Sequence, residues 1–200
     1  MTALIATVAG GYLLGSVPFG YLLVRVFRGQ DIRLTGSGNI GATNVSRTSP
    51  ALGFVTLLLD ALKGFAAVGF AHALFPGQNI LLGVAGLAAV AGHMFPIWLR
   101  FRGGKGVATA LGSLVAFAPK TTLALIGVFA VTLLLFRYVS LASIVAAASF
   151  PALGSVIEPR GGKAPLLAFS AAAGLIIARH YQNIGRLINH TEPRFQWRRR

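Results

Sequence analysis

Three stretches of the chain combine glycines with hydroxyl, amide and basic side chains, a combination that can bind phosphate. The first stretch reads GSGNIGATNVSR and spans residues 36–47. Its glycines let successive backbone N–H groups converge on an anion, and its serine, threonine and asparagine side chains add neutral hydrogen-bonding groups. Arg47 adds a guanidinium that binds two phosphate oxygens at once. The candidate binding residues of this stretch are Gly36, Ser37, Gly38, Asn39, Gly41, Thr43, Asn44 and Arg47.

The same stretch contains the pattern G-x-G-x-x-G, which is typical of dinucleotide-binding turns. Such a turn needs a strand before it, a helix after it and a βαβ unit around it. Here both flanking segments are apolar, and Asp60, at the distance of a ribose-binding acid, falls inside one of them. We therefore exclude the nucleotide interpretation. The remaining alternative to an anion site is a loop of ordinary turn residues.

The second stretch, residues 92–109, reads GHMFPIWLRFRGGKGVAT. Its GGKG is not a Walker A loop, because the earlier glycine is missing and Gly106 stands where serine or threonine follows the lysine. Glycines around Lys105, just before an apolar helix, still predict an anion site at a helix N-terminus, with Lys105 as a point charge on phosphate. The alternatives are a lipid-headgroup contact for Lys105 and interfacial packing for His93. The candidates are His93, Gly103, Gly104, Lys105, Gly106 and Thr109.

The third stretch, residues 179–192, reads RHYQNIGRLINHTE. His180, Asn183 and Arg186 follow one another at intervals of three, so a helix would place them near one face. They combine a base that titrates near neutrality, a neutral orienting amide and a phosphate-binding cation. Glu192 is one of only four acidic residues, and we expect it to pair with a cation of the site. The alternative is a juxtamembrane basic helix.

Three polar side chains lie within apolar segments. Asp60 and Lys63 are separated by three residues near the middle of one segment. Each alone would cost about 2.5–3.5 kcal/mol at the centre of a bilayer, so we expect them to pair and to have a structural role. Ser143 lies just inside a later segment, where it either donates to a phosphate or bonds a carbonyl of its own helix.

The elements that must position these residues are membrane helices. The chain of 200 residues is 55% hydrophobic and only 11% charged, whereas about a quarter of the residues of a soluble domain are charged. Several apolar runs approach the roughly 20 residues that span a bilayer. We predict an all-α, polytopic integral membrane protein with about seven transmembrane helices and a single domain over residues 1–200. The apolar segments are 3–26, 51–75, 79–98, 107–118, 121–136, 139–157 and 164–180.

The basic residues orient these segments. With the N-terminus outside and the C-terminus inside, every lysine and arginine falls in an inside loop except Lys63 and the three outside residues Lys120, Arg160 and Lys163. This agrees with the positive-inside rule, and the agreement would be lost if the short segment 107–118 failed to span. All three polar stretches then face the cytoplasm, where we expect one composite site.

The net charge of +14 reflects these inside loops. The arginines 198–200 predict a contact with anionic lipid rather than with nucleic acid. The absence of cysteine excludes disulfides, thiolate metal sites and a cysteine nucleophile. No cluster of acidic residues is available for a divalent metal, so we expect neither a metal nor a cofactor.

Two common catalytic arrangements are also disfavoured. No histidine is followed by aspartate after four intervening residues, the spacing of a common histidine–aspartate acyltransferase motif. A serine nucleophile would need an activating base and an orienting group, and no acid stands beside His93 or His180. We therefore expect no covalent intermediate on a serine of this chain.

The three stretches, together with LDALKG at residues 59–64 and RYVSLASI at residues 137–144, resemble the motifs of the bacterial acyl-phosphate:glycerol-3-phosphate acyltransferases. The resemblance covers essentially the whole chain, in order. It implies an enzyme of the bacterial inner membrane that transfers a fatty acyl group from acyl phosphate, and not from acyl-CoA, to the 1-hydroxyl of glycerol 3-phosphate. The products would be lysophosphatidic acid and inorganic phosphate, in the first step of phospholipid synthesis. The third motif of the family usually has glycine two residues before the glutamate, where this chain has His190.

This resemblance suggests a division of roles. We expect Ser37, Gly38, Arg47 and Lys105 to neutralise phosphate charge, and His180, Asn183 and Arg186 to orient glycerol 3-phosphate. Asn39 or Asn44, with backbone N–H groups, would steady the oxyanion of the tetrahedral intermediate.

The proton acceptor is open at this point. His180 is the first candidate for the general base, His93 the second, and a phosphate oxygen of the acyl donor the third. The expected partners are the two substrates and membrane lipids, with no nucleic acid and no obligate protein partner. The competing classes are a transporter for a phosphorylated anion, which the lack of internal repeats disfavours, and a lipid-binding scaffold without catalysis.

Overall fold

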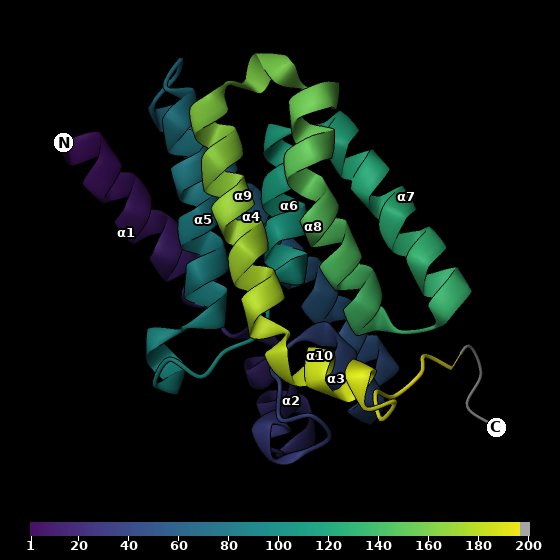
Figure 1. Cartoon of the computed structure of the whole chain (residues 1–200). Coiled ribbons are helices and arrows are strands. Elements are labelled where there is room, and N and C mark those ends of the chain that lie inside the picture. Colours follow the sequence, from purple (N-terminus) through teal and green to yellow (C-terminus); the bar gives the residue numbers. More distant parts are fainter. Residues whose placement is uncertain (197–200) are drawn as a thin grey trace.

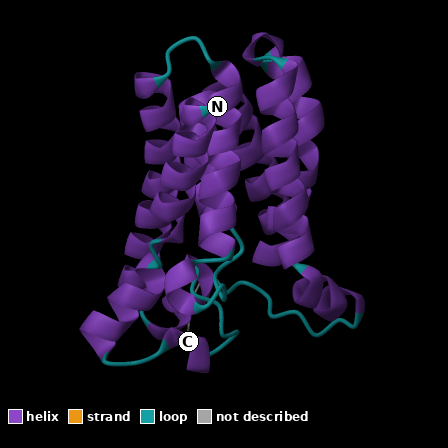
Figure 2. Ribbon diagram, turned by 90° about the vertical axis from the view of Figure 1, so that its left-hand side faces the viewer, coloured by secondary structure: helices purple, strands orange, loops and turns teal. Residues whose placement is uncertain are grey.

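The computed structural model describes residues 1–196, and every regular element within them is helical (Figures 1 and 2). The longer helices run side by side, and the short helices gather at one end of the bundle. The elements are α1 (Thr2–Ser16), α2 (Phe19–Arg28), η1 (Ile32–Leu34), α3 (Ala42–Thr48), α4 (Pro50–Leu74), α5 (Asn79–Met94), η2 (Ile97–Leu99), α6 (Val107–Phe117), α7 (Pro119–Phe136), α8 (Val139–Ile157), η3 (Pro159–Gly161), α9 (Lys163–Arg179) and α10 (Tyr181–Ile188). No strand occurs in residues 1–196, in keeping with the exclusion of a Rossmann unit. The predicted lipid contact of arginines 198–200 lies outside the described residues.

The prediction of an all-helical, polytopic membrane protein is confirmed, and the count of seven spans is supported only in part. Five segments are long and apolar enough to cross a membrane: Thr2–Arg28, Pro50–Leu74, Asn79–Leu99, Pro119–Phe136 and Val139–Ile157. The pair α9 and α10, bent by 53°, makes a sixth if it is counted as one span. Helix α6 has 11 residues and a length of about 16 Å, short of a roughly 30 Å hydrocarbon core.

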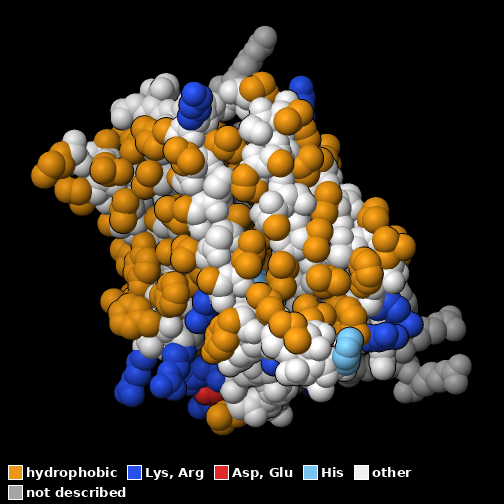
Figure 3. All heavy atoms as spheres, viewed as in Figure 1, with side chains coloured by type: hydrophobic (Ala, Val, Ile, Leu, Met, Phe, Trp, Pro, Cys, Tyr) orange, Lys and Arg blue, Asp and Glu red, His pale blue; other side chains and the backbone are white. Residues whose placement is uncertain are grey.

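The first apolar segment, predicted over residues 3–26, is interrupted at Val17 and Pro18. Proline cannot donate a backbone hydrogen bond, which favours a break at this point. Beyond the break, α2 lies with α3 and α10 at the lower end of the view in Figure 1. Lysine and arginine side chains also gather at this end, whereas apolar side chains cover the bundle above it (Figure 3).

Small residues allow the helices to approach closely. A methyl group on Gly112 of α6 would overlap the carbonyl oxygen of Ala61 in α4, and one on Gly64 of α4 would overlap the carbonyl oxygen of Thr109 in α6. Helix α1 packs on α5 in the same way, through Gly15. Close backbone contact through small residues is how membrane helices associate, since lipid is as apolar as their own side chains.

Many large apolar side chains of the helices are exposed on the outside of the bundle, as expected of surfaces that face lipid. The interior holds an apolar cluster that joins α4, α5, α6, α7, α8 and α9 and includes Val68, Leu82, Leu114, Phe150 and Phe169. The rings of Phe117 and Phe169 stack with their centroids 4.9 Å apart. This core lies above the end at which the polar stretches meet.

The polar stretches gather at one end because of the direction in which each helix runs. The chain enters this end along α1, α5, α7 and α9 and leaves it along α4, α6 and α8 (Figure 1). The N-terminus lies toward the opposite end and the C-terminal segment at this end (Figures 1 and 2). The expectation of one composite site at a single end of the bundle agrees with this arrangement.

Candidate active site

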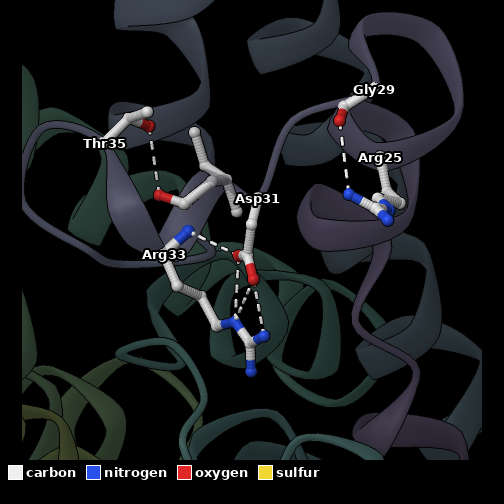
Figure 4. Close-up of polar contacts among 6 residues, drawn as sticks. Arg25, Gly29, Asp31, Arg33 and Thr35 are labelled. Carbon is white, nitrogen blue, oxygen red and sulfur yellow. Dashed lines mark hydrogen bonds and ion pairs between the residues drawn. The ribbon is translucent and has the colours of Figure 1, made fainter.

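The first polar stretch follows a tightly hydrogen-bonded turn between α2 and α3 (Figure 4). The guanidinium of Arg33 folds back on Asp31, with Nη2–Oδ2 at 2.6 Å and Nε–Oδ1 at 2.9 Å. This hydrogen bonding lowers the pKa of Asp31, against the opposing effect of burial. Arg25 donates to the carbonyl of Gly29 at 3.2 Å, and Thr35 donates to a carbonyl within η1. Arg33 is therefore used to hold the turn that leads into residues 36–47.

The buried amide of Asn44 holds the first stretch in shape. Its Oδ1 accepts from the backbone N–H of Ser37 at 2.9 Å, and its Nδ2 donates to the carbonyls of Thr35 and Asn39 at 3.0 and 2.9 Å. Gly36 has φ +57°, and a methyl group there would overlap Oδ1 of Asn44. Because its amide is occupied by the loop, the geometry favours a positioning role for Asn44 over the oxyanion role predicted from the sequence.

The loop presents its remaining polar groups at the surface. The side chains of Ser37, Thr43 and Arg47 are exposed. Asn39 is half-buried, and its Oδ1 accepts from the backbone N–H of Gly41 at 2.8 Å. The N–H groups of Ser37 and Gly38 bond within the loop, so the predicted convergence of N–H groups on an anion is only partly open to a ligand.

The second stretch is clamped from two sides. The backbone N–H of Gly104 donates to the carbonyl of His93 at 3.0 Å. From α9, Arg179 donates to the carbonyls of Gly103 and Gly104 at 3.3 and 3.4 Å. Lys105 follows directly, two residues before α6 begins. We call these contacts of Gly103 and Gly104 with His93 and Arg179 the clamp. The clamp fixes the backbone from which the Lys105 side chain extends.

A chain of polar contacts joins the second and third stretches. Lys105 Nζ donates to Asn183 Oδ1 at 2.5 Å, and Asn183 Nδ2 donates to Glu192 Oε1 at 2.7 Å. Glu192 also accepts from Arg186 Nε at 2.7 Å and from Ser140 Oγ at 2.6 Å. The expectation that Glu192 pairs with a cation of the site is confirmed. We call Lys105, Asn183, Arg186 and Glu192 the cation cluster.

The electrostatics of this cluster favour an added anion. Burial lowers the pKa of Lys105 to about 8; the Glu192 carboxylate opposes this, and the positive charges of Arg186, Arg47 and Arg179 lower it further. Arg47 of the first stretch is thus close enough to act on Lys105. Burial raises the pKa of Glu192, but hydrogen bonds hold it below its usual value, so this carboxylate stays charged. Several cations share one carboxylate, and a phosphate would relieve their mutual repulsion.

His180 lies at the bend between α9 and α10. It is 2% exposed, and its Nδ1 is 2.7 Å from the carbonyl oxygen of Ile176. A carbonyl oxygen only accepts, so Nδ1 carries the proton and Nε2 of the neutral ring keeps a lone pair. The predicted set His180, Asn183 and Arg186 is brought to one region, with Arg186 partly exposed.

His93 lies apart from the cation cluster, in the bundle interior. Its Nδ1 is 3.0 Å from Lys63 Nζ and 3.5 Å from Asp60 Oδ1. The expectation that no acid stands beside His93 is therefore wrong, because Asp60 approaches from another helix. The expected pair of Asp60 and Lys63 is confirmed, with Nζ–Oδ1 at 2.8 Å.

Two predicted residues, Ser143 and Thr109, make no hydrogen bond to the cation cluster, whereas two residues that were not predicted, Ser140 and Arg179, contact Glu192 and the Gly103–Gly104 segment. Ser143 donates to the carbonyl of Val139 in its own helix at 2.8 Å, and the Oγ1 of Thr109 is fully buried. Ser140, one turn earlier in α8, contacts Glu192 instead. Arg179 was present in the third stretch but was not among the candidates. Its clamp on Gly103 and Gly104 joins segments distant in sequence, which no local pattern indicates.

Comparison with known proteins identifies the family. A family model described as glycerol-3-phosphate acyltransferase matches residues 5–190. Proteins named glycerol-3-phosphate acyltransferase from Geotalea daltonii and Paramagnetospirillum magneticum are each 48% identical to this chain. The alignments cover 98% and 97% of this chain and 100% and 94% of these relatives.

The chain belongs to the glycerol-3-phosphate acyltransferase family. A crystal structure of PlsY (YgiH), an integral membrane glycerol 3-phosphate acyltransferase, in its glycerol 3-phosphate form is 41% identical, with a TM-score of 0.91 over 98% of this chain and 96% of that chain. The lysophosphatidic acid form of PlsY is 40% identical, with a TM-score of 0.88 over the same shares of the two chains. This acyltransferase is thus a multi-pass membrane protein, and its bacterial relatives imply the inner membrane.

Proposed function

We propose that the protein transfers a fatty acyl group from acyl phosphate to the 1-hydroxyl of glycerol 3-phosphate. The products are lysophosphatidic acid and inorganic phosphate, and the reaction is the first step of phospholipid synthesis. The cation cluster carries this proposal, because Lys105 and Arg186, with the charges of Arg47 and Arg179 nearby, match two substrates that each bear a phosphate. The glycerol 3-phosphate and lysophosphatidic acid forms of PlsY support the acceptor and the product.

In this proposal the residues of the site divide the work as follows. Lys105 and Arg186 bind phosphate oxygens, and Asn183 and Glu192 hold these two cations in place. Ser37, on the exposed first loop, donates to phosphate. The remaining candidate residues act around them: Gly36, Gly38, Gly41, Thr43 and Arg47 in the first loop, Gly103, Gly104, Gly106 and Thr109 around Lys105, and Asn39 as an oxyanion donor.

The proton of the attacking hydroxyl goes to His180 in this proposal. Its Nδ1 is held by Ile176, so Nε2 is the atom that accepts. A phosphate oxygen of the acyl donor is the alternative acceptor, since acyl phosphate has a good leaving group and positioning can supply much of the rate. His93 is no longer favoured, because Lys63 occupies its Nδ1 and its Nε2 faces Gly104.

Transfer is direct in this proposal, without a metal and without a covalent acyl-enzyme. The positive side chains of the site supply the charge neutralisation that a metal ion supplies in other phosphoryl sites. The hydroxyl oxygen forms a bond to the acyl carbon, the bond from that carbon to the phosphate oxygen breaks, and phosphate leaves. An acylated protein trapped with the donor alone would refute direct transfer.

The site faces the cytoplasm in the proposed topology, with seven spans and the N-terminus outside. Helix α6 supplies the seventh crossing. It follows Lys105 at the lower end of the bundle and passes directly into α7, which begins at the upper end (Figure 1). Its close packing on α4 shields it from lipid along one side, which supports a crossing shorter than usual.

The test is a turnover assay with purified protein in lipid bilayers. Palmitoyl phosphate and glycerol 3-phosphate are supplied together and separately, and phosphate and lysophosphatidic acid are both measured. We expect the two products in equal amounts, and only when both substrates are present. A transporter would move glycerol 3-phosphate across the bilayer without releasing phosphate, and a scaffold would bind lysophosphatidic acid without turnover; either result would overturn the proposal.

A further inference from the structure

Three ionisable side chains form a buried network inside the membrane helices, separate from the cation cluster. Asp60 and Lys63 come from α4 and His93 from α5, and they are 2%, 3% and 4% exposed. Ionisable groups at such positions are costly and are seldom present without a functional reason. The proposed mechanism uses none of the three.

Lys63 is the centre of this network. Its ammonium lies 2.8 Å from Asp60 Oδ1 and 3.0 Å from His93 Nδ1. It also donates to the carbonyl of Val17, at the break between α1 and α2, at 2.8 Å. An ammonium has three protons, and these three partners account for all of them when Nδ1 of His93 holds the lone pair. The arrangement fixes both the tautomer and the orientation of the His93 ring.

The other side of the His93 ring meets the segment that carries Lys105. A methyl group on Gly104 would overlap Nε2 of His93, so the ring lies directly against this glycine. The carbonyl of His93 accepts from the Gly104 N–H at 3.0 Å. The Arg179 guanidinium also holds this segment, by donating to the carbonyls of Gly103 and Gly104. The oriented ring is thus one wall of the clamp that precedes Lys105.

We infer that Asp60, Lys63 and His93 are positioning residues for Lys105, acting through the contact of the His93 ring with Gly104. This rests on the proposed role of Lys105 in binding phosphate. Replacing a buried ion pair with apolar residues is often neutral or stabilising, so stability alone does not account for three ionisable groups here. A fixed ring that sets the position of the phosphate-binding ammonium does account for them.

Inorganic phosphate, a product of the proposed reaction, is a probe that does not depend on turnover. Its dissociation constant is measured on purified protein in lipid nanodiscs for the unmodified chain, His93→Asn, Lys105→Met and the double variant. Asparagine keeps an acceptor for Lys63 near the place of Nδ1 but removes the ring atoms against Gly104. The unfolding midpoint of each form is recorded alongside.

We expect Lys105→Met to weaken phosphate binding about tenfold or more, because it removes a charge-assisted hydrogen bond. His93→Asn should weaken it severalfold with little change in the unfolding midpoint. The double variant should bind within about twofold of Lys105→Met alone, because residues that act through one another are not additive. The inference would be overturned if the double variant weakened phosphate binding by the product of the two single effects, or if His93→Asn had no effect. The network would then have only a structural role.

A different set of phosphate-binding results would contradict the proposed function itself. If the unmodified chain binds no phosphate, or if Lys105→Met leaves binding unchanged, the phosphate site itself is contradicted whatever the His93 variant does. Gly104→Ala provides a second variant, because its methyl group displaces the His93 ring, and it should weaken phosphate binding as His93→Asn does. Gly174→Ala is the matched control, since open space surrounds that glycine in α9. Equal binding by the two alanine variants would also count against the inference.

Discussion

At the scale of single residues, the proposed chemistry depends on a lysine that keeps its charge against burial. Lys105 is placed among several cations, and its pKa is lowered to about 8. Its ammonium can therefore lose its proton within the pH range in which the enzyme can be assayed. A bound phosphate dianion would favour the charged form again, so the effect belongs to the free enzyme.

The first prediction concerns the alkaline limb of kcat/KM, which reports ionisations of the free enzyme. Lys105 is charged below pH 8 and loses its charge as the pH rises, so kcat/KM should fall about tenfold for each pH unit above 8. Lys105→Arg keeps its charge throughout this range and should lack this limb. The same limb in both proteins would show that another group is responsible.

The second prediction concerns His180 as the general base. His180→Ala and His180→Asn should lower kcat about 10²–10⁴-fold, the usual contribution of a positioned base. Burial lowers the pKa of His180 to about 4, so both variants should also remove an acid limb of the pH–rate profile near pH 4. Asparagine keeps polar contacts at this position, so a base role predicts a large loss for both variants. A profile that keeps its shape in both variants would exclude the histidine and favour a phosphate oxygen of the donor.

At the scale of elements, the site is held by helices that approach one another through small residues. Helix α6 begins two residues after Lys105 and packs on α4 through Gly64 and Gly112. Because the opposing atoms are backbone carbonyl oxygens, a side chain cannot rotate away to make room. The distance between α4 and α6 therefore depends on glycine at these two positions.

The third prediction follows from this packing. Gly112→Ala should destabilise the protein by about 1–3 kcal/mol, the usual cost of overpacking, because its methyl group would overlap the carbonyl of Ala61. Gly127→Ala in α7 has open space around it and should be neutral or stabilising by up to about 1 kcal/mol. Thermal unfolding in lipid nanodiscs compares the two variants. Equal stability would mean that α4 and α6 are not as close as described.

The helices could be predicted from the sequence better than their breaks and contacts. Long apolar runs predicted most of the spans, since hydropathy alone decides whether a segment can cross a membrane. The break at Pro18 was missed because it lies within one continuous apolar run. The intervals of His180, Asn183 and Arg186 predicted a shared region, and the scarcity of acids predicted the partner of Glu192. Ser140 gave no such signal, because its contact with Glu192 depends on how α8 and the C-terminal segment fold together.

The backbone at His190 shows why glycine suits this position. This residue has φ +56°, in the left-handed region that glycine adopts without strain. The turn before Glu192 therefore keeps the conformation that glycine favours, although the side chain differs.

At the scale of the whole molecule, the distribution of charge supports the proposed orientation in the membrane. The cation cluster and the gathering of basic side chains lie at one end of the bundle (Figure 3). Helices α7 and α9 begin at the other end, which places Lys120 and Lys163 away from the cluster. Three crossings, α6 to α8, connect these ends within the proposed topology.

The fourth prediction tests that orientation. The chain has no cysteine, so a single introduced thiol is an unambiguous reporter. Lys120→Cys should react with a membrane-impermeant reagent only from outside the cell. Gln30→Cys, at an exposed position after α2, is the matched control and should react only from inside. Reaction of both thiols from the same side would contradict the seventh crossing by α6.

The central claim is that a phosphate leaving group, and not a thioester, delivers the acyl chain to glycerol 3-phosphate. The most direct measurement supplies purified protein with glycerol 3-phosphate and either palmitoyl phosphate or palmitoyl-CoA, and follows the formation of lysophosphatidic acid. The account predicts turnover with the acyl phosphate alone and its loss in Lys105→Met. Turnover only with the CoA ester would contradict the proposed donor.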